Sequence, residues 1–436
     1  METKELIERR KKSLSHSIFH YYSEPLHLVK ATGCKVYDAE GKEYIDCIGG
    51  IVSISIGHNH PKIKQALKDK FDNDDIQHGP TIYLTEPVVR LAENLLKHAP
   101  GLSRVFVSNS GSEANEYAVM AARNATGNDT MISLRHGYHG GTNVTLSLCG
   151  HSNWKFKAQP FASTVHAVQP DCYRCPFGKE RNSCGLECAK DVEDVILTAT
   201  NGKIAGVIVE PIMGVGGFID PPVEYHKKVY DICKKYGGMY ISDEVQAGIG
   251  RTGDSFFAIY QSGVTPDMIS MAKSLGSGAP VGAVVMKEEL SEALKGKIHF
   301  NTFGGDPYQA LQAAMTVEII DEENLMAKAK EMGDVLKDGL KSLMAKHSIV
   351  GDVRGRGLLL GMELVKDRTT KEYASAEAGM MMEETRKRGL LIGKGGLFGN
   401  VIRVTPPYTI SKEECEKIIS ILDESLDAVN KHFGHK

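Results

Sequence analysis

A carboxylate and an amine stand thirty residues apart, each directly after a short apolar run that predicts a buried strand. The carboxylate is Asp243 and the amine is Lys273. An amine can carry an aldehyde cofactor as a Schiff base, and a carboxylate can keep a pyridine nitrogen protonated so that the ring accepts electrons. Pyridoxal phosphate needs both groups. Taken singly, a solvated lysine and a helix-capping aspartate are the simpler interpretation.

A turn of small residues provides a candidate phosphate site. Ser108-Asn-Ser-Gly-Ser-Glu-Ala-Asn115 joins a predicted strand to a predicted helix. The backbone amides of Gly111 and Ser112, with the Ser112 hydroxyl, would point at an anion where the helix dipole is favourable. Tyr138, in the segment 135–141, could stack on a ring face, although alone it would more simply be a core or surface aromatic.

Strand-like runs alternate with helical segments along the chain. This alternation predicts an α/β fold with a mostly parallel sheet, in which ligands collect at the carboxyl ends of the strands. From about Gln309 to His347, an amphipathic, Lys/Glu-rich pattern predicts a long helical stretch that leads to a second, smaller unit. The runs that predict strands of the main sheet are 104–108, 130–134, 204–210, 238–242 and 280–286.

Composition excludes several classes of protein. The 436 residues are 42% hydrophobic and 25% charged with a net charge of −3, which is ordinary for a soluble enzyme and offers no argument for nucleic acid or an anionic membrane. No apolar run approaches the roughly 20 residues that a spanning helix needs. The charged N-terminus lacks the pattern of a signal or transit peptide. Nine cysteines without an export signal indicate a reducing compartment, and we expect the cytoplasm.

Four of the cysteines form two close pairs. Cys172 and Cys175 are followed by Cys184 and Cys188 after a polar stretch. Such pairs resemble a structural zinc or iron–sulfur knuckle. An inserted surface loop with reduced thiols explains the pattern as well, so metal binding stays open.

The order of the motifs resembles the class III (subgroup II) pyridoxal-phosphate-dependent aminotransferases of fold type I. The motifs are Asn-Ser-Gly-Ser-Glu-Ala-Asn, Tyr-His-Gly, Val-Glu-Pro-Ile, Asp-Glu-Val-Gln-Ala-Gly-Ile-Gly-Arg-Thr-Gly, Met-Ala-Lys-Ser-Leu-Gly and Asn-Thr-Phe-Gly-Gly-Asp-Pro, and the resemblance extends from about Pro25 to Val429. It implies a large domain with a mostly parallel sheet between helices and a smaller α+β domain. The expected divisions are 1–58, packing with the small domain, 59–315, containing the Cys-rich insert 171–189, and 316–436.

The resemblance also implies the roles of individual residues. Lys273 would carry the cofactor and Asp243 would pair with its pyridinium nitrogen. Val245 would pack on the ring face opposite Tyr138. Thr302 would complete the phosphate site of the other subunit, which implies a homodimer, possibly paired into a tetramer. The full set expected at the cofactor is Ser110, Gly111, Ser112, Tyr138, His139, Glu210, Asp243, Val245, Gln246, Lys273 and Thr302.

Departures from the family pattern bear on the substrate. Arg403 resembles the family's carboxylate-binding arginine, and Ile51 and Tyr83 are also expected to bind the substrate. Relatives that act on glutamate, ornithine or γ-aminobutyrate carry a glutamate where this chain has Val215, and γ-aminobutyrate enzymes carry an arginine where it has Gly141. Binding of a second carboxylate is therefore poorly supported. The closest resemblance is to the alanine–glyoxylate and β-alanine (3-aminoisobutyrate)–pyruvate branch.

We therefore expect a ping-pong transaminase that moves an amino group from a small amino acid or ω-amino acid to a small 2-oxo acid such as pyruvate or glyoxylate. Three alternatives stay open. A lyase acting on a phosphorylated amino alcohol, or an amino-acid racemase, would share every cofactor residue. A 4-aminobutyrate-type enzyme would use 2-oxoglutarate. A nucleotide-binding or metal-knuckle interaction protein would keep the sheet and the cysteines without chemistry.

Overall fold

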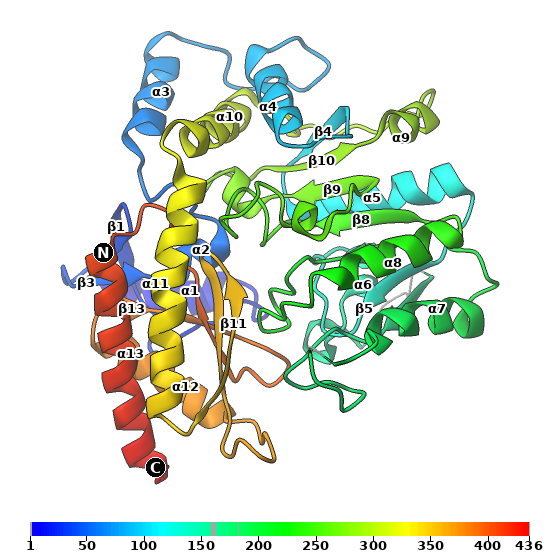
Figure 1. The fold of residues 1–436 in the computed structure, drawn as a ribbon. Coiled ribbons are helices and arrows are strands. Elements are labelled where there is room, and N and C mark those ends of the chain that lie inside the picture. Colours follow the sequence, from blue (N-terminus) through cyan, green and yellow to red (C-terminus); the bar gives the residue numbers. More distant parts are fainter. Residues whose placement is uncertain (1, 158–162, 182, 436) are drawn as a thin grey trace.

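A seven-stranded sheet forms the centre of the larger part of the molecule, in the order β4-β10-β9-β8-β7-β5-β6 (Figure 1). The computed structural model describes residues 2–157, 163–181 and 183–435. Six of these strands run parallel to one another, and β10 is antiparallel to both of its neighbours. The bounds are β4 Arg104–Ser108, β5 Met131–Leu134, β6 Thr164–Ala167, β7 Gly206–Val209, β8 Met239–Asp243, β9 Met268–Met271 and β10 Gly282–Met286.

Alternate residues of these strands enter two different cores. Val207 and Val209 of β7 join the core that includes side chains of α7 (Glu187–Ala199) and α8 (Glu224–Lys235). Ile208, between them, joins the core built around α5 (Gly111–Thr126). Because successive side chains of a strand point to opposite faces, the sheet is covered on both sides. The mostly parallel α/β sheet predicted from the sequence is confirmed, with helices on both faces.

A second part of the fold contains two four-stranded sheets and the helices α11, α12 and α13. One sheet has the order β11-β12-β15-β14 and the other β1-β2-β3-β13, in which β13 from the C-terminal part pairs in parallel with β3 from the N-terminal part. The bounds are β1 Leu28–Thr32, β2 Lys35–Asp38, β3 Glu43–Asp46, β11 Val350–Arg356, β12 Leu359–Leu364, β13 Leu390–Leu391, β14 Gly393–Gly395, β15 Val401–Val404, α11 Leu325–Lys346, α12 Ser375–Lys387 and α13 Lys412–Phe433.

The helical stretch expected from Gln309 to His347 is two helices. α10 (Pro307–Glu322) ends before Asn324, and α11 begins directly after it. Asn324 has φ of 49°, a left-handed conformation that asparagine tolerates better than most residues and that interrupts a right-handed helix. The acidic run 321–323 also lies at the carboxyl end of α10, where negative charge is unfavourable.

The remaining helices are short or lie at the periphery. In Figure 1, α11 and α13 run side by side along one flank of the molecule, and α3, α4 and α10 gather at one end. No helix in the described ranges combines the length and the apolarity needed to cross a membrane. The bounds are α1 Thr3–Ser13, α2 Gly49–Val52, α3 Pro61–Asp72, α4 Glu86–Lys97, α6 Asn143–Leu148 and α9 Glu288–Ala293.

Candidate active site

A cavity of about 180 Å³ lies at the carboxyl edge of the seven-stranded sheet. Asp243 ends β8, Glu210 follows β7 and Lys273 lies just past β9. Because these strands are parallel, their carboxyl ends meet at one edge, where ligands of such sheets bind. The cavity is lined by Gly111, Ser112, Asn115, Tyr138, His139, Gly140, Glu210, Asp243, Val245, Gln246 and Lys273.

Asp243 is a buried carboxylate held by three donors. Its Oδ2 accepts from His139 Nδ1 at 2.7 Å and from Asn115 Nδ2 at 2.8 Å, and its Oδ1 accepts from the Val245 amide at 3.1 Å. Asn115 is fixed in turn by the hydroxyl of Ser270, which donates to its Oδ1 at 2.5 Å. Three donors prevent the carboxylate from rotating, so Asp243 presents it to the cavity in one fixed orientation.

Lys273 has two unusual properties. It stands at φ of 46° at the start of a 3₁₀ turn (Lys273–Leu275), a backbone conformation that costs free energy and often marks functional sites. Burial, together with the positive charge of Arg403, lowers the pKa of its amine to about 8, and the carboxylates of Asp243 and Glu210 only partly offset this. The amine is thus far closer to neutrality at physiological pH than an ordinary lysine.

The amino end of α5 faces the same cavity. Ser110 caps this helix, because its hydroxyl oxygen accepts from the Glu113 amide at 3.2 Å. Gly111 and Ser112 line the cavity in the first turn, where free backbone amides and the helix dipole favour an anion. Gly140 lies so close to this turn that a Cβ added to it would stand 2.5 Å from the Ser112 hydroxyl oxygen, so only glycine leaves that hydroxyl in place.

Glu210 and Tyr138 form the wall beside Asp243. The Glu210 carboxylate accepts from the Tyr138 amide at 3.0 Å and from the Gly214 amide at 2.8 Å. Burial, with the nearby charge of Asp243, raises the pKa of Glu210 to about 7 even though His139 opposes the shift. The Tyr138 ring is half-buried and packs against the ring of Trp154, with 4.9 Å between the centroids.

Arg403 lies behind the cavity wall and not in it. β15 carries it between β12 and β14, opposite Gly361 and Gly393. Its Nη2 donates to Gln246 Oε1 at 2.6 Å, and its guanidinium stands 4.6 Å from the centre of the Phe218 ring. A neutral amide of the cavity wall therefore links the buried guanidinium to the cavity.

Three residues expected at the site are exposed elsewhere on this chain. Thr302 lies on an exposed loop, and Ile51 and Tyr83 are 40% and 62% exposed. None of them lines the cavity that contains Asp243. Ser110 lines a neighbouring cavity of about 280 Å³, which shares Gly111 and Lys273 with the first. A single chain therefore leaves part of the expected set outside the cavity.

The family model for class III aminotransferases matches residues 20–426, nearly the whole chain. The chain belongs to the class III aminotransferases. This aminotransferase is 40% identical to alanine–glyoxylate aminotransferase 2 homolog 2 of Arabidopsis thaliana, with 97% of its own residues and 87% of the relative's covered. It is 37% identical to the taurine–pyruvate aminotransferase of Bilophila wadsworthia, covering 99% and 98% of the two chains.

Other relatives and solved structures extend the comparison. A leucine/methionine racemase of Thermococcus litoralis is 37% identical, with 99% and 95% covered. A Bacillus anthracis aminotransferase superposes with a TM-score of 0.91 at 34% identity over 98% of this chain and 100% of its own. The omega transaminase of Pseudomonas jessenii, solved in complex with PMP, superposes with a TM-score of 0.91 at 29% identity over 98% of each chain. Fold type I is thereby confirmed, as is the resemblance to the alanine–glyoxylate branch.

The residues around the cavity of the aminotransferase fit pyridoxal phosphate, on which class III aminotransferases depend. A fixed carboxylate, an amine of lowered pKa, an aromatic side chain and a helix amino end face one space. The sequence predicted no role for Asn115 or Gly140. The motif contained Asn115, but only the fold brings its amide beside Asp243.

Proposed function

We propose that this protein is a pyridoxal-phosphate-dependent transaminase that moves an amino group from a small amino acid or ω-amino acid to pyruvate, glyoxylate or a similar small 2-oxo acid. The observation that carries the proposal is the pairing of Asp243 and Lys273 across one cavity with the amino end of α5. When bound, pyridoxal phosphate supplies an electron sink for the pair of electrons left by a departing proton.

Each wall residue would hold one part of the cofactor. The α5 amides at Gly111 and Ser112 would bind the phosphate, and the Asp243 carboxylate would hold the ring nitrogen protonated. Tyr138 and Val245 would cover the two ring faces. His139 would act through Asp243, because its Nδ1 donates to that carboxylate at 2.7 Å.

Lys273 would carry the cofactor and then serve as the base. With a pKa near 8, a substantial fraction of the free amine is neutral at pH 7 to 8 and can accept the proton from the substrate α-carbon. The same ammonium can return the proton to the cofactor side. A single residue that accepts and donates suits a 1,3-proton shift, and the two half-reactions of transamination would then follow ping-pong kinetics.

Arg403 would bind the substrate carboxylate. Its guanidinium is the buried cation behind Gln246, and a planar fork binds a carboxylate through two parallel hydrogen bonds. Val215 stands where relatives with dicarboxylate substrates carry glutamate, and Gly141 is exposed and has no charged side chain. Monocarboxylic partners are favoured, in keeping with the glyoxylate and pyruvate in the names of two relatives.

A homodimer would complete the site. Thr302 is exposed, four residues after Ile298, which is 98% exposed, and Leu84, beside Tyr83 in another segment, is 95% exposed. Apolar surface of this kind is typical of an interface. Thr302 would then reach the phosphate site of the partner.

A panel of donors and acceptors tests this proposal. We expect turnover of alanine, β-alanine, 3-aminoisobutyrate or an ω-amine with pyruvate or glyoxylate, measured as the new amino acid and the new oxo product. A strong preference for 2-oxoglutarate would instead support the 4-aminobutyrate-type function. Release of ammonia without an acceptor would indicate a lyase.

Racemisation is the second candidate, because the Thermococcus litoralis relative is a leucine/methionine racemase. Chiral analysis of L-leucine, L-methionine and L-alanine incubated without any oxo acid separates the two functions. A transaminase forms at most one equivalent of oxo product per site and little D-enantiomer. Catalytic formation of the D-enantiomer would exclude transamination as the main reaction.

A further inference from the structure

The loop between β6 and α7 gathers four cysteines around one small space. A cavity of about 20 Å³ lies among them, and it shares no lining residue with the cavity that contains Lys273. A space of this size holds about one water molecule or one ion. None of the four sulfurs forms a disulfide, and all four side chains are half-buried. The cysteines are Cys172, Cys175, Cys184 and Cys188.

We propose that these four cysteines bind a structural zinc ion. Their spacing is Cys-x₂-Cys followed, after eight residues, by Cys-x₃-Cys, and each pair has the spacing of two to four residues that is typical of zinc-binding cysteine pairs. On binding, four Zn–S bonds would form, four S–H bonds would break and the protons would pass to water. No oxidation or reduction is involved.

The electrostatics of the loop explains what a cation would change. Burial, with the neighbouring sulfurs of Cys172, Cys184 and Cys175, raises the pKa of the Cys188 thiol to about 12. Burial and repulsion from the neighbouring sulfurs therefore both disfavour a thiolate at Cys188 when no cation is present. A divalent cation would favour the thiolates instead, because each of them is then attracted to a shared positive charge.

Binding of one ion would bring the four sulfurs closer together than they lie in this structure. Among the described residues, His347, Asp423 and Asp427 are the only three potential ligands whose atoms all lie within 4.8 Å of one another. The four sulfurs are spread more widely around their cavity. Rotation of cysteine side chains, each with a single χ1 torsion before the sulfur, is the adjustment required.

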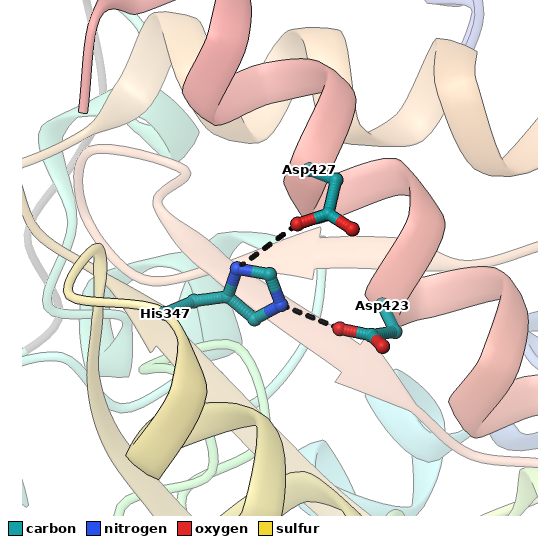
Figure 2. Close-up of side chains that lie close together, drawn as sticks. All are labelled: His347, Asp423 and Asp427. Atoms are coloured by element: carbon teal, nitrogen blue, oxygen red, sulfur yellow. Dashed lines mark hydrogen bonds and ion pairs between the residues drawn. The ribbon is translucent and has the colours of Figure 1, made fainter. Parts of the chain in front are cut away.

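Figure 2 shows the three side chains of the His347 cluster, whose ligand atoms lie close enough together for a metal site. A cation of the protein already pairs with both of its carboxylates. Lys346 Nζ lies 2.8 Å from an Asp423 oxygen and 3.4 Å from an Asp427 oxygen. Both ring nitrogens of His347 are also engaged, one with Asp423 at 2.6 Å and the other with Asn430 at 3.0 Å. This cluster joins α11 to α13, and Lys346 already supplies positive charge to its two carboxylates.

Zinc suits the cysteine loop better than an iron–sulfur cluster or disulfides. The space of about 20 Å³ fits one ion and is too small for a cluster of several iron and sulfur atoms. The spacing also departs from the cysteine patterns of ferredoxin-type clusters. Paired disulfides would need no central space at all.

The loop ties the large sheet to the sheet that carries Arg403. Arg174, between the first two cysteines, binds Glu363 of β12 at 2.6 Å, and Lys371 donates to the Tyr173 carbonyl at 2.6 Å. β12 pairs directly with β15, the strand of Arg403. A bound zinc ion would therefore stabilise the contact between the two parts of the molecule rather than take part in the chemistry.

Metal analysis of the full-length holoenzyme, purified without chelators, tests the proposal. We expect about one zinc ion per chain by mass spectrometry and a first shell of four sulfur atoms at about 2.3 Å by X-ray absorption. An iron–sulfur chromophore, a disulfide among these cysteines in peptide mapping, or a protein that remains metal-free after incubation with zinc under reducing conditions would overturn it.

Variants locate the ion. Cys172→Ser with Cys175→Ser should remove the zinc and lower the melting temperature, and Cys415→Ala, which changes a buried cysteine of α13, should retain it. Equal zinc loss in both proteins would place the ion elsewhere and refute the assignment. If the double variant fails to fold, removal of zinc from the unmodified enzyme by a chelator, followed by thiol counting, replaces it. Four newly reactive thiols are expected, and no increase would contradict the proposal.

Discussion

Arg403 Nη2 donates to Gln246 Oε1 over 2.6 Å, so a neutral amide holds the cation that we assign to the substrate carboxylate. Gln246 in turn packs on Gly214, where an added Cβ would stand 2.4 Å from the Gln246 side-chain carbonyl carbon. An incoming carboxylate would have to displace only an amide, not a glutamate. If Arg403 binds the substrate carboxylate as we propose, it would do so without first breaking an ion pair.

Replacing Arg403 with alanine should lower kcat/KM selectively for substrates that carry a carboxylate. Loss of a charge-assisted bidentate contact costs about 3 kcal/mol, or about 10²-fold in kcat/KM for pyruvate. The half-reaction with an amine that lacks a carboxylate should change far less. Arg403→Lys, which keeps the charge without the fork, should recover only part of the loss. An equal fall for both substrate classes would argue against a role in carboxylate binding.

Lys273 should react with aldehydes in a pH range set by its lowered pKa. In the cofactor-free protein, reductive methylation of Lys273 should rise with pH, reach half its maximum near pH 8 and level off above that pH, because the neutral amine is the nucleophile. Lys62, whose pKa is raised by its hydrogen bond to Glu322, should keep gaining reactivity at higher pH. Peptide mass spectrometry measures both sites, and a common midpoint would contradict the assigned environment of Lys273.

The lowered pKa of Lys273 also affects the stability of the cofactor-free protein. Between about pH 8 and the ordinary lysine value of 10.5, the unfolded chain binds more protons than the folded one, so Lys273 makes the stability of the cofactor-free protein rise with pH in this range. Lys273→Met should remove this rise. Melting curves of the two proteins across this range test it.

Asp243→Asn should reduce kcat by about 10²- to 10³-fold, the usual effect of removing one preorganised charge, because the amide cannot hold the ring nitrogen protonated. Glu244→Gln is the matched control. Glu244 is the adjacent buried carboxylate, but it accepts from the Ile259 amide at 2.8 Å and does not line the cavity. Similar losses in both variants would show that general destabilisation, not the position of Asp243, is responsible.

Thr302 should serve the partner's site. Thr302→Asp would repel a phosphate, and Lys273→Ala would abolish turnover, so each variant alone should be nearly inactive. When the two are denatured together and refolded, a mixed dimer would contain one site with both residues intact, and about a quarter of the unmodified activity should return. No recovery, in a mixture that forms mixed dimers, would contradict the shared site.

Glu363 should be essential for the contact between the two parts of the molecule. It is buried between Arg354 at 2.7 Å and Arg174 at 2.6 Å. Burial opposes its ionisation, but the two arginines outweigh this and lower its pKa, so its stabilising contribution is lost as pH falls through that lowered pKa. Glu363→Gln should cost about 3–5 kcal/mol of stability in denaturant unfolding.

The control for this change is Glu372→Gln. Glu372 pairs with Lys366 on the surface at 2.6 Å, and exposed pairs contribute about 0–1 kcal/mol. Comparable destabilisation by the two variants would show that the buried position of Glu363 confers no special importance.

The order of the motifs by itself determined the family, the fold class and the identity of Asp243 and Lys273 as a pair. This was possible because each motif reflects a requirement of the local structure or chemistry. Examples are the glycine-containing turn before a helix, and the carboxylate and the lysine that follow buried strands. The alternation of apolar runs also predicted the sheet. It did not predict the break at Asn324, because one left-handed residue leaves the helical pattern of apolar residues unchanged.

The contacts of these residues depend on how the chain folds. The contacts of Asp243 with Asn115 and His139 join positions more than a hundred residues apart, and no local pattern encodes them. The lowered pKa of Lys273 depends on burial and on a cation more than a hundred residues further along the chain. Likewise, the four cysteines were two pairs in the sequence, and folding placed them around one space. Electrostatics and packing act through space, so the chemistry of these groups became defined only when the strands brought them together.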